Sequence, residues 1–137
     1  MPSTKTRLPA GGWMVLSVFV FTIASAQSNW QRTYGGPGDD QGLSVQQTAD
    51  GGYIIAGYAE SFGAGDADVY LIKTDAQGRT LWTRAYGGPG KDEGYSVQQT
   101  TDGGYAILGT TGSFGAGNSD VCLIGEKRKR GTLPLFL

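Results

Sequence analysis

The sequence contains no histidine and a single cysteine, Cys122, among its 137 residues. The missing histidine removes the commonest general base, the commonest zinc ligand and every pairing of a serine or cysteine nucleophile with an imidazole. A lone cysteine cannot form a disulfide within the chain. Because these absences remove the usual hydrolytic and zinc-dependent machinery, we expect a protein that is not an enzyme. We expect no catalytic, cofactor-binding or metal-binding residues and no cofactor.

Helical periodicity and positive charge are also scarce. Beyond residue 26, no window of a dozen residues repeats its apolar positions about every 3.6 residues, so helices are not expected. Residues 27–124 carry eleven acidic and five basic side chains. Nucleic-acid-binding domains need a basic face. The folded part therefore predicts no nucleic-acid partner.

The first 26 residues have the pattern of a secretion signal. Lys5 and Arg7 supply positive charge, residues 13–24 form an almost wholly apolar run, and small residues at 24–26 precede the cleavage site. We expect a signal-peptide helix that is removed after Ala26, leaving an extracellular or cell-surface protein with no stable membrane span. The alternative is an uncleaved anchor, although the run is shorter than the ~20 apolar residues that span a bilayer.

An internal repeat organises the remainder of the chain. Trp30–Ile72 aligns with Trp82–Ile124 without a gap, and 29 of the 43 aligned positions are identical. The shared blocks are YGGPG, SVQQT, DGGY and SFGAG. Identity of this kind at a fixed spacing indicates a tandem duplication. We therefore divide residues 27–124 into a first repeat (30–81) and a second repeat (82–124).

Each repeat predicts four short strands joined by glycine-rich turns. Asp50-Gly51 between two apolar segments is a strong hairpin signal, because glycine accepts a positive φ without a steric clash. Residues 53–56 and 69–72 are apolar on both faces, which is typical of strands covered by sheets on both sides. The strands expected in the first repeat are 44–48, 53–58, 68–74 and 80–86.

Four short strands in a repeat of this length are typical of a propeller blade. From Trp30 to Ile124 the repeats resemble secreted bacterial and archaeal β-propeller proteins, which contain tandem units of the pattern W…YGG…SVxxTxDGGY…SFGxG…DxYLIKTD. The resemblance implies an all-β fold of two antiparallel four-stranded blades, the second incomplete. We expect a non-catalytic binding or scaffold role toward a protein or glycan ligand. The alternative is a fragment of an exported propeller enzyme, either a quinoprotein or a glycan-active protein.

Two blades cannot close a ring, and a repeat array needs about three units or more to bury its core. Trp30–Tyr34 corresponds to the fourth strand of a repeat, so we predict that it too is a strand. We expect either a piece of a larger propeller or a homo-oligomer of three or four chains that associate through this strand.

The end of the chain departs from the repeat. By register, residues 125–133 should resemble 73–81, yet only Thr132 and Leu133 match. We expect 125–137 to be a divergent, basic and disordered tail produced by a shifted reading frame or by the end of a contig. The alternative is that Lys127–Arg130 acts as a nuclear or polyanion-binding signal.

Several acidic residues are candidates for a calcium site, because calcium binds several oxygen ligands. The alternative, which we favour, is that each carboxylate caps a turn or a strand and accepts hydrogen bonds from loop amides. These residues are Asp39, Asp40, Asp66, Asp68, Asp75 and Asp92.

Other residues have a structural and a functional interpretation. Gln46, Gln47, Gln98 and Gln99 are expected on first strands, where they either bind a ligand or form a solvated wall. Tyr34, Tyr53, Tyr86 and Tyr105 recur by register and are interpreted as packing between sheets, with sugar stacking as the alternative. Asp75-x-x-Gly78-x-x-x-Trp82 resembles the blade-docking motif of pyrroloquinoline-quinone dehydrogenases, which implies a packing role for Trp82. Cys122 stands at the register of Tyr70 and is predicted to be buried.

Overall fold

The computed structural model describes residues 29–127, in which seven strands and no helix are found. The described residues therefore contain no helix that could cross a membrane. The predicted signal peptide and residues 128–137 of the predicted tail lie outside the described residues. The strands are β1 (Asp40–Gln47), β2 (Tyr53–Ala59), β3 (Asp68–Thr74), β4 (Thr80–Tyr86), β5 (Asp92–Gln99), β6 (Tyr105–Thr111) and β7 (Asp120–Glu126).

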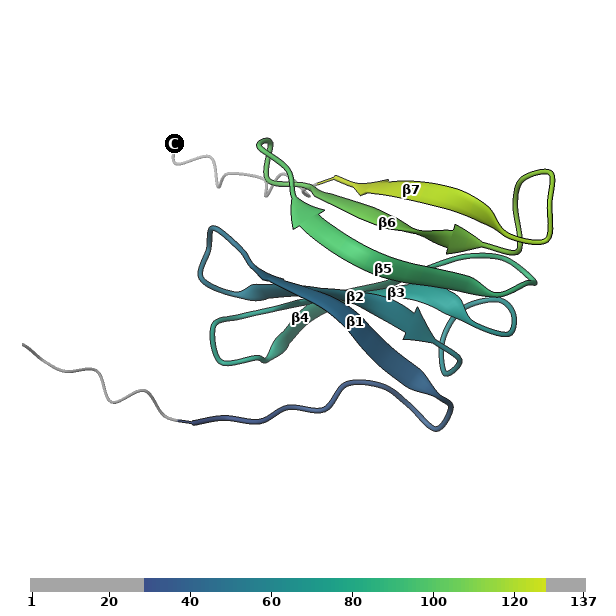
Figure 1. Ribbon diagram of the computed structural model, residues 1–137. Helices are drawn as coiled ribbons and strands as arrows, with labels where there is room; N and C mark the ends of the chain where they lie inside the picture. The colour runs from purple at the N-terminus through teal and green to yellow at the C-terminus, as the bar shows by residue number, and fades with distance from the viewer. Residues whose placement is uncertain (1–28, 128–137) are drawn as a thin grey trace, which may run out of the picture.

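The strands form two antiparallel sheets in which neighbours in sequence are neighbours in space. The first sheet has the order β1-β2-β3-β4 and the second the order β5-β6-β7. Figure 1 shows the second sheet stacked on the first, with β5 lying beside β1. The prediction of an all-β protein with four strands followed by three is confirmed.

Glycine shapes the hairpin turns. Gly51 and Gly103 adopt φ values of 82° and 81°, which a residue with a Cβ rarely tolerates. The Asp50 carboxylate accepts hydrogen bonds from the Gly52 amide at 3.0 Å and from the Thr48 hydroxyl at 2.5 Å. Asp102 accepts the equivalent hydrogen bonds in the second repeat. The DGG turns therefore form as predicted, and in the same way in both repeats.

The first strand of each sheet contains a bulge. The register between β1 and β2 shifts between Gly42 and Ser44, and the same shift recurs between β5 and β6. At this point the backbones approach closely, since a Cβ placed on Gly57 would lie 1.8 Å from the carbonyl oxygen of Gln41. Only glycine fits at position 57 without a backbone shift.

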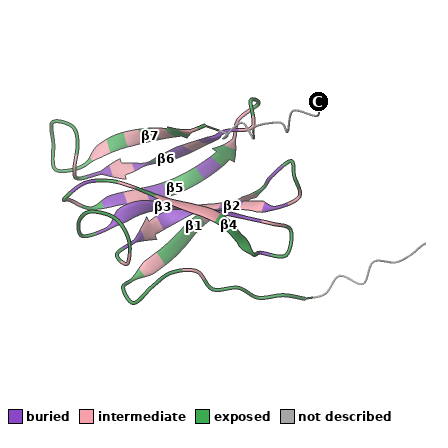
Figure 2. Ribbon diagram, turned by 180° about the vertical axis from the view of Figure 1, so that it is seen from behind, coloured by how far each residue is buried: buried purple, intermediate pink, exposed green. Residues whose placement is uncertain are grey.

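The core lies between the two sheets. It is formed by Ile54, Ala56, Val69 and Leu71 of the first sheet, together with Val97, Tyr105 and Ile107 of the second. Figure 2 shows buried residues concentrated on the strands where the sheets meet, whereas β7 alternates between exposed and half-buried positions. Six of the seven residues of β3 are buried, as expected for a strand that is apolar on both faces, whereas Tyr53 and Ile55 of β2 are only half-buried.

The structure corrects several predictions. β1 begins at Asp40, four residues before the predicted strand, because pairing with β2 continues across the bulge. Residues 30–34 belong to no strand, since the described chain places no neighbouring strand beside them. Cys122 is only half-buried, as is Tyr70 at the same register of the first sheet. β7 extends to Glu126, so the strand includes the first two residues of the predicted tail.

Candidate functional site

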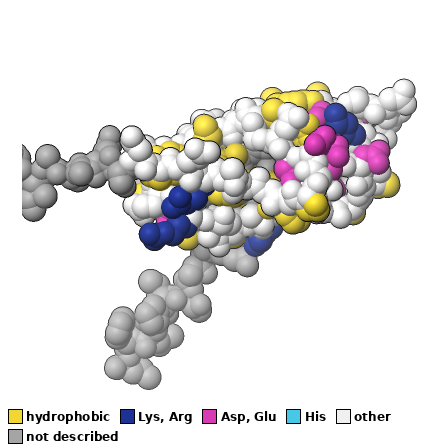
Figure 3. All heavy atoms as spheres, turned by 90° about the horizontal axis from the view of Figure 1, so that it is seen from below, with side chains coloured by type: hydrophobic (Ala, Val, Ile, Leu, Met, Phe, Trp, Pro, Cys, Tyr) yellow, Lys and Arg dark blue, Asp and Glu magenta, His cyan; other side chains and the backbone are white. Residues whose placement is uncertain are grey.

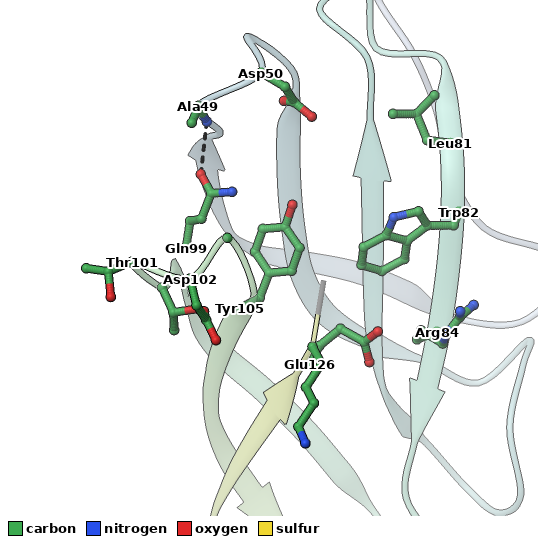
Figure 4. A pocket seen from close by; sticks show the side chains of 13 residues that line it. Ala49, Asp50, Leu81, Trp82, Arg84, Gln99, Thr101, Asp102, Tyr105 and Glu126 are labelled. Atoms are coloured by element: carbon green, nitrogen blue, oxygen red, sulfur yellow. Dashed lines mark hydrogen bonds between the residues drawn. The ribbon is translucent and has the colours of Figure 1, made fainter. Parts of the chain in front are cut away.

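A groove of about 1030 Å³ lies between the two sheets at the end where the DGG turns are found. One wall is formed by β4, with Trp82 and Arg84, and the other by the start of β6 and the end of β7, with Tyr105 and Glu126. Figure 4 shows Trp82 and Tyr105 projecting toward each other from these walls. The groove combines aromatic and charged side chains, and it is the candidate site.

The aromatic pair forms the centre of the groove. The ring centroids of Trp82 and Tyr105 are 5.9 Å apart and the rings are tilted by 57°. Because alternate residues of a strand share a face, β4 places Arg84 beside Trp82, with its guanidinium 5.6 Å from the indole centroid. This contact is a cation–π interaction. The wall therefore presents a flat apolar surface next to a fixed positive charge.

Hydrogen-bonding groups surround this aromatic centre. The Gln99 side-chain oxygen accepts a hydrogen bond from the Ala49 amide at 2.9 Å, which joins the turns of the two sheets. Glu126 accepts a hydrogen bond from the Tyr86 hydroxyl. Burial, and then the Glu126 carboxylate, raises the pKa of the Tyr86 hydroxyl well above its ordinary value of 10. Tyr86 therefore remains protonated at physiological pH.

The equivalent aromatic pair of the first repeat lies outside the groove, and its Trp30 is 42% exposed. Trp30 and Tyr53 have centroids 5.8 Å apart and rings tilted by 60°. The turn between β3 and β4 lies against this pair, since a Cβ on Gly78 would be 2.4 Å from Trp30 Cζ3. The Tyr34 hydroxyl donates a hydrogen bond of 2.7 Å to the Gly78 carbonyl. Only the second pair lines the groove.

The candidate calcium ligands hold loops in place. Asp40 accepts hydrogen bonds from the Gly36 amide at 2.7 Å and the Ser61 hydroxyl at 2.6 Å. Asp92 repeats this arrangement with the Gly88 amide at 3.0 Å and the Ser113 hydroxyl at 2.5 Å. Each serine hydroxyl is therefore committed to a loop contact. The loop contacts of Ser61 and Ser113 favour a structural role for these serines over a role as nucleophiles.

The other aspartates are dispersed along the chain. Asp68 accepts a hydrogen bond from the Ala64 amide at 2.7 Å, and Asp75 accepts one from the Arg79 amide at 2.8 Å. Among residues 29–127, no three acidic or cysteine side chains gather closely enough to hold a metal ion. Burial raises the pKa of Asp68, and the nearby charge of Asp92 raises it further.

The glutamines of the first strands join the sheets. The Gln46 side-chain oxygen accepts a hydrogen bond of 2.6 Å from the Gln99 amide. The Ser44 hydroxyl accepts one of 3.2 Å from the Val97 amide. These residues therefore serve as an inter-sheet contact, and Gln99 also lines the groove. The sequence did not indicate Arg84 and Glu126, which reach the groove only because the two sheets stack at this stagger.

Stability should fall at acid pH because of Asp50. The Thr48 hydroxyl, and then the Lys73 ammonium at 3.0 Å, lower the pKa of Asp50 from 3.8 to about 2. A carboxylate with a lowered pKa in the folded state stabilises that state above pH 3.8 and loses this effect as the pH falls toward 2. We expect Asp50→Asn to flatten the dependence of unfolding free energy on pH in this window, measured by urea titration.

The matched control for this measurement is Asp102→Asn. Asp102 has the equivalent threonine contact, which does most to lower its pKa, but Gly125 stands at the register of Lys73 and the charge of Lys127 is the smallest of the contributions to that pKa. The control should change the pH dependence less than Asp50→Asn does. An equal effect would contradict a role for the ion pair.

Comparison with protein-family models and with curated proteins found no match for the chain. The function must therefore be argued from the repeat, from the groove and from the N-terminal segment.

Proposed function

We propose that the chain is an exported, non-catalytic repeat protein of the β-propeller type, which binds a protein or glycan ligand or acts as a scaffold outside the cytoplasm. The observation that carries this proposal is that the two aromatic pairs have the same geometry. The ring centroids are 5.8 Å apart in the first pair and 5.9 Å apart in the second, and the two pairs are separated by 52 residues in the sequence. Equivalent packing at equivalent register is typical of repeats that stack into an array.

The groove is the proposed ligand site. Sugars and peptides present an apolar face together with hydrogen-bonding groups. Trp82 offers a matching apolar face, with the Arg84 cation and the Glu126 carboxylate beside it. Figure 3 shows acidic side chains gathered near one end of the molecule and most of the basic ones toward the other, without a continuous basic surface across that side. This distribution favours a neutral or mixed-charge ligand over a polyanion.

We expect Trp82→Ala to weaken ligand binding by roughly 30-fold, because truncation of a central aromatic anchor typically costs about 2 kcal/mol. The matched control is Trp30→Ala, since Trp30 makes the same aromatic contact but lies outside the groove. A glycan array and a peptide array are probed with the chain and with both variants. Array ligands that both variants bind equally well would contradict the groove as the site.

Export is tested separately. The chain is expressed in a bacterium with its own first 26 residues, and the secreted fraction is analysed by mass spectrometry. A product that begins at Gln27 supports the proposal, and retention of the whole chain in the cytoplasm contradicts it.

The alternative function is a fragment of an exported propeller enzyme, favoured by the Asp75-x-x-Gly78-x-x-x-Trp82 motif. Asp75 accepts hydrogen bonds from the Gln77 and Arg79 amides in the turn, and Trp82 packs against the second sheet. Both contacts suit the packing role that the resemblance implies. Further repeats and catalytic residues encoded downstream, in another reading frame, would favour the enzyme.

A further inference from the structure

The second sheet exposes apolar side chains on the face that points away from the first sheet. Leu108, Val121 and Leu123 are 49%, 78% and 75% exposed. We call these residues the outer face of the second sheet. Large apolar side chains gathered on a single face are characteristic of an interaction surface.

The molecule itself shows what covers such a face. The residues at the same register in the first sheet are Ala56, Val69 and Leu71, and all three are fully buried beneath the second sheet. Two of the three positions carry the same residue type in both sheets, and the third changes from alanine to leucine. A sheet of this repeat is therefore the natural cover for the outer face of the second sheet.

The first sheet has the complementary surface. Gly94 and Val97 of the second sheet pack against the first sheet, and Val97 is only 6% exposed. Their register equivalents, Gly42 and Val45, are both exposed, Val45 to 65%. We call Gly42 and Val45 the outer face of the first sheet. It has the same residues as the buried surface, but nothing in the described chain covers it.

Glycines leave space on both outer faces. A Cβ on Gly94 would lie 2.8 Å from Val69 Cγ1 across the internal interface, whereas a Cβ on Gly42 meets only Ile55 of its own sheet, at 3.4 Å. A Cβ on Gly65 would lie 2.2 Å from the Gly88 carbonyl oxygen. Its register equivalent, Gly117, has no atom closer than 3.8 Å. At the interface between the two sheets, the neighbouring repeat fills the space beside Gly94 and Gly65. The same space beside Gly42 and Gly117 is open in the described chain.

Polar contacts are also repeated. Ser44 and Gln46 accept hydrogen bonds from the backbone of the second sheet. Ser96 and Gln98 hold the same register and are exposed. They are placed to accept the equivalent hydrogen bonds from the Val45 and Gln47 amides of another copy.

The segment 30–34 completes the match. Trp30 contacts Tyr53 as Trp82 of β4 contacts Tyr105, so this segment lies on the first sheet as β4 lies on the second. β4 pairs with β3, whereas β7, the register equivalent of β3, has only β6 as a neighbour among the described strands. Residues 30–34 of one copy and the unpaired edge of β7 in another copy are therefore placed to pair as β4 pairs with β3.

We propose that copies of this chain associate head to tail, with the outer face of the second sheet of one copy packed on the outer face of the first sheet of the next. Residues 30–34 of the next copy pair with β7 of the first. This contact is heterologous, so it forms a closed ring or an open filament. Propeller rings contain about four to eight sheets, and a ring of three or four chains, with the two sheets of residues 29–127 from each, has six or eight and lies within that range. The inference rests on the repeat architecture of the proposed function and not on export or ligand binding.

The test uses the purified chain and two glycine variants, analysed by size-exclusion chromatography with light scattering across a dilution series. Gly42→Val blocks the outer face of the first sheet, and Gly117→Val blocks the loop beside the outer face of the second. We expect three to four times the mass of one chain for the unaltered protein and the mass of one chain for each variant. Thermal unfolding verifies that each variant is folded. Ala76→Val, in the exposed turn between β3 and β4, is the matched control and should keep the larger mass.

Mixing the two variants tests the direction of the contact. Gly42→Val keeps the outer face of the second sheet and Gly117→Val keeps the outer face of the first. One contact can therefore form between the two variants, and association stops at a dimer. We expect twice the mass of one chain in the mixture and one chain in each separate sample. A single-chain mass for the unaltered protein overturns the proposal, as does a larger mass for the folded variants or a mixture without pairs. None of these results bears on secretion or on the groove ligand, so the proposed function is tested independently.

Discussion

Leu71→Ala is expected to lower the free energy of unfolding by about 2–5 kcal/mol, the usual cost of removing a fully buried leucine side chain. Leu71 is fully buried between the two sheets, where it contributes to the core with Val69 and Ile107. Its removal leaves a cavity that the stacked sheets can close only in part. Since a small domain is stable by about 5–15 kcal/mol, a loss of this size is a large fraction of the total. Urea unfolding followed by tryptophan fluorescence measures it.

Leu123→Ala is the matched control, because Leu123 is the same residue type at the same register and is 75% exposed. In the single-chain Gly42→Val background, this control should change the free energy of unfolding by less than about 0.5 kcal/mol. Equal losses for the two substitutions would show that the sheets do not stack as described.

Gly57→Ala is expected to cost about 1–3 kcal/mol or more, the range for overpacking a site that cannot relax easily. The added Cβ would lie 1.8 Å from the Gln41 carbonyl oxygen, and both atoms belong to or adjoin the backbone of paired strands. The bulge at Gly42 would have to open for the methyl group to fit. The midpoint of urea unfolding should fall accordingly.

The control for this substitution is Gly42→Ala, at the residue directly paired with Gly57, and both changes are measured in the single-chain Gly117→Val background. A Cβ there has an ordinary contact of 3.4 Å with Ile55, so the change should stay within about 0.5 kcal/mol. If Gly57→Ala proved as mild as this control, the close approach of the two backbones would be contradicted.

The hairpins could be predicted from the sequence because their causes are local. Apolar residues at 69–72 and the turn residues Asp75 and Gly78 mark the bounds of β3 and the start of β4, and both strands were predicted with the bounds that the structure has. The start of β1 was missed because Gln41 and Gly42 show no apolar alternation. Their pairing with β2 depends on the bulge, which is a property of two strands together.

Predictions that depended on a neighbouring sheet were less successful. Residues 30–34 have the sequence of a strand, but a strand requires a partner to pair with, and none is described beside them. Cys122 was predicted to be buried, but Tyr70 at the same register of the first sheet is also only half-buried. The groove could not be predicted for the same reason, since Arg84 and Glu126 come together through the relative placement of two sheets.

The hydrogen bonds of Ser44 and Gln46 to the backbone of the second sheet join the sheets closely where β1 lies beside β5. On the other side, the groove between Trp82 and Glu126 keeps β4 and β7 apart. Two layers that approach closely at one margin, and are bridged only by the long Tyr86 and Glu126 side chains at the other, form a wedge, so a longer stack would curve. The amide contacts set the inner radius of that curve and the bulk of Trp82 sets the outer one. A smaller side chain at position 82 would therefore straighten the stack.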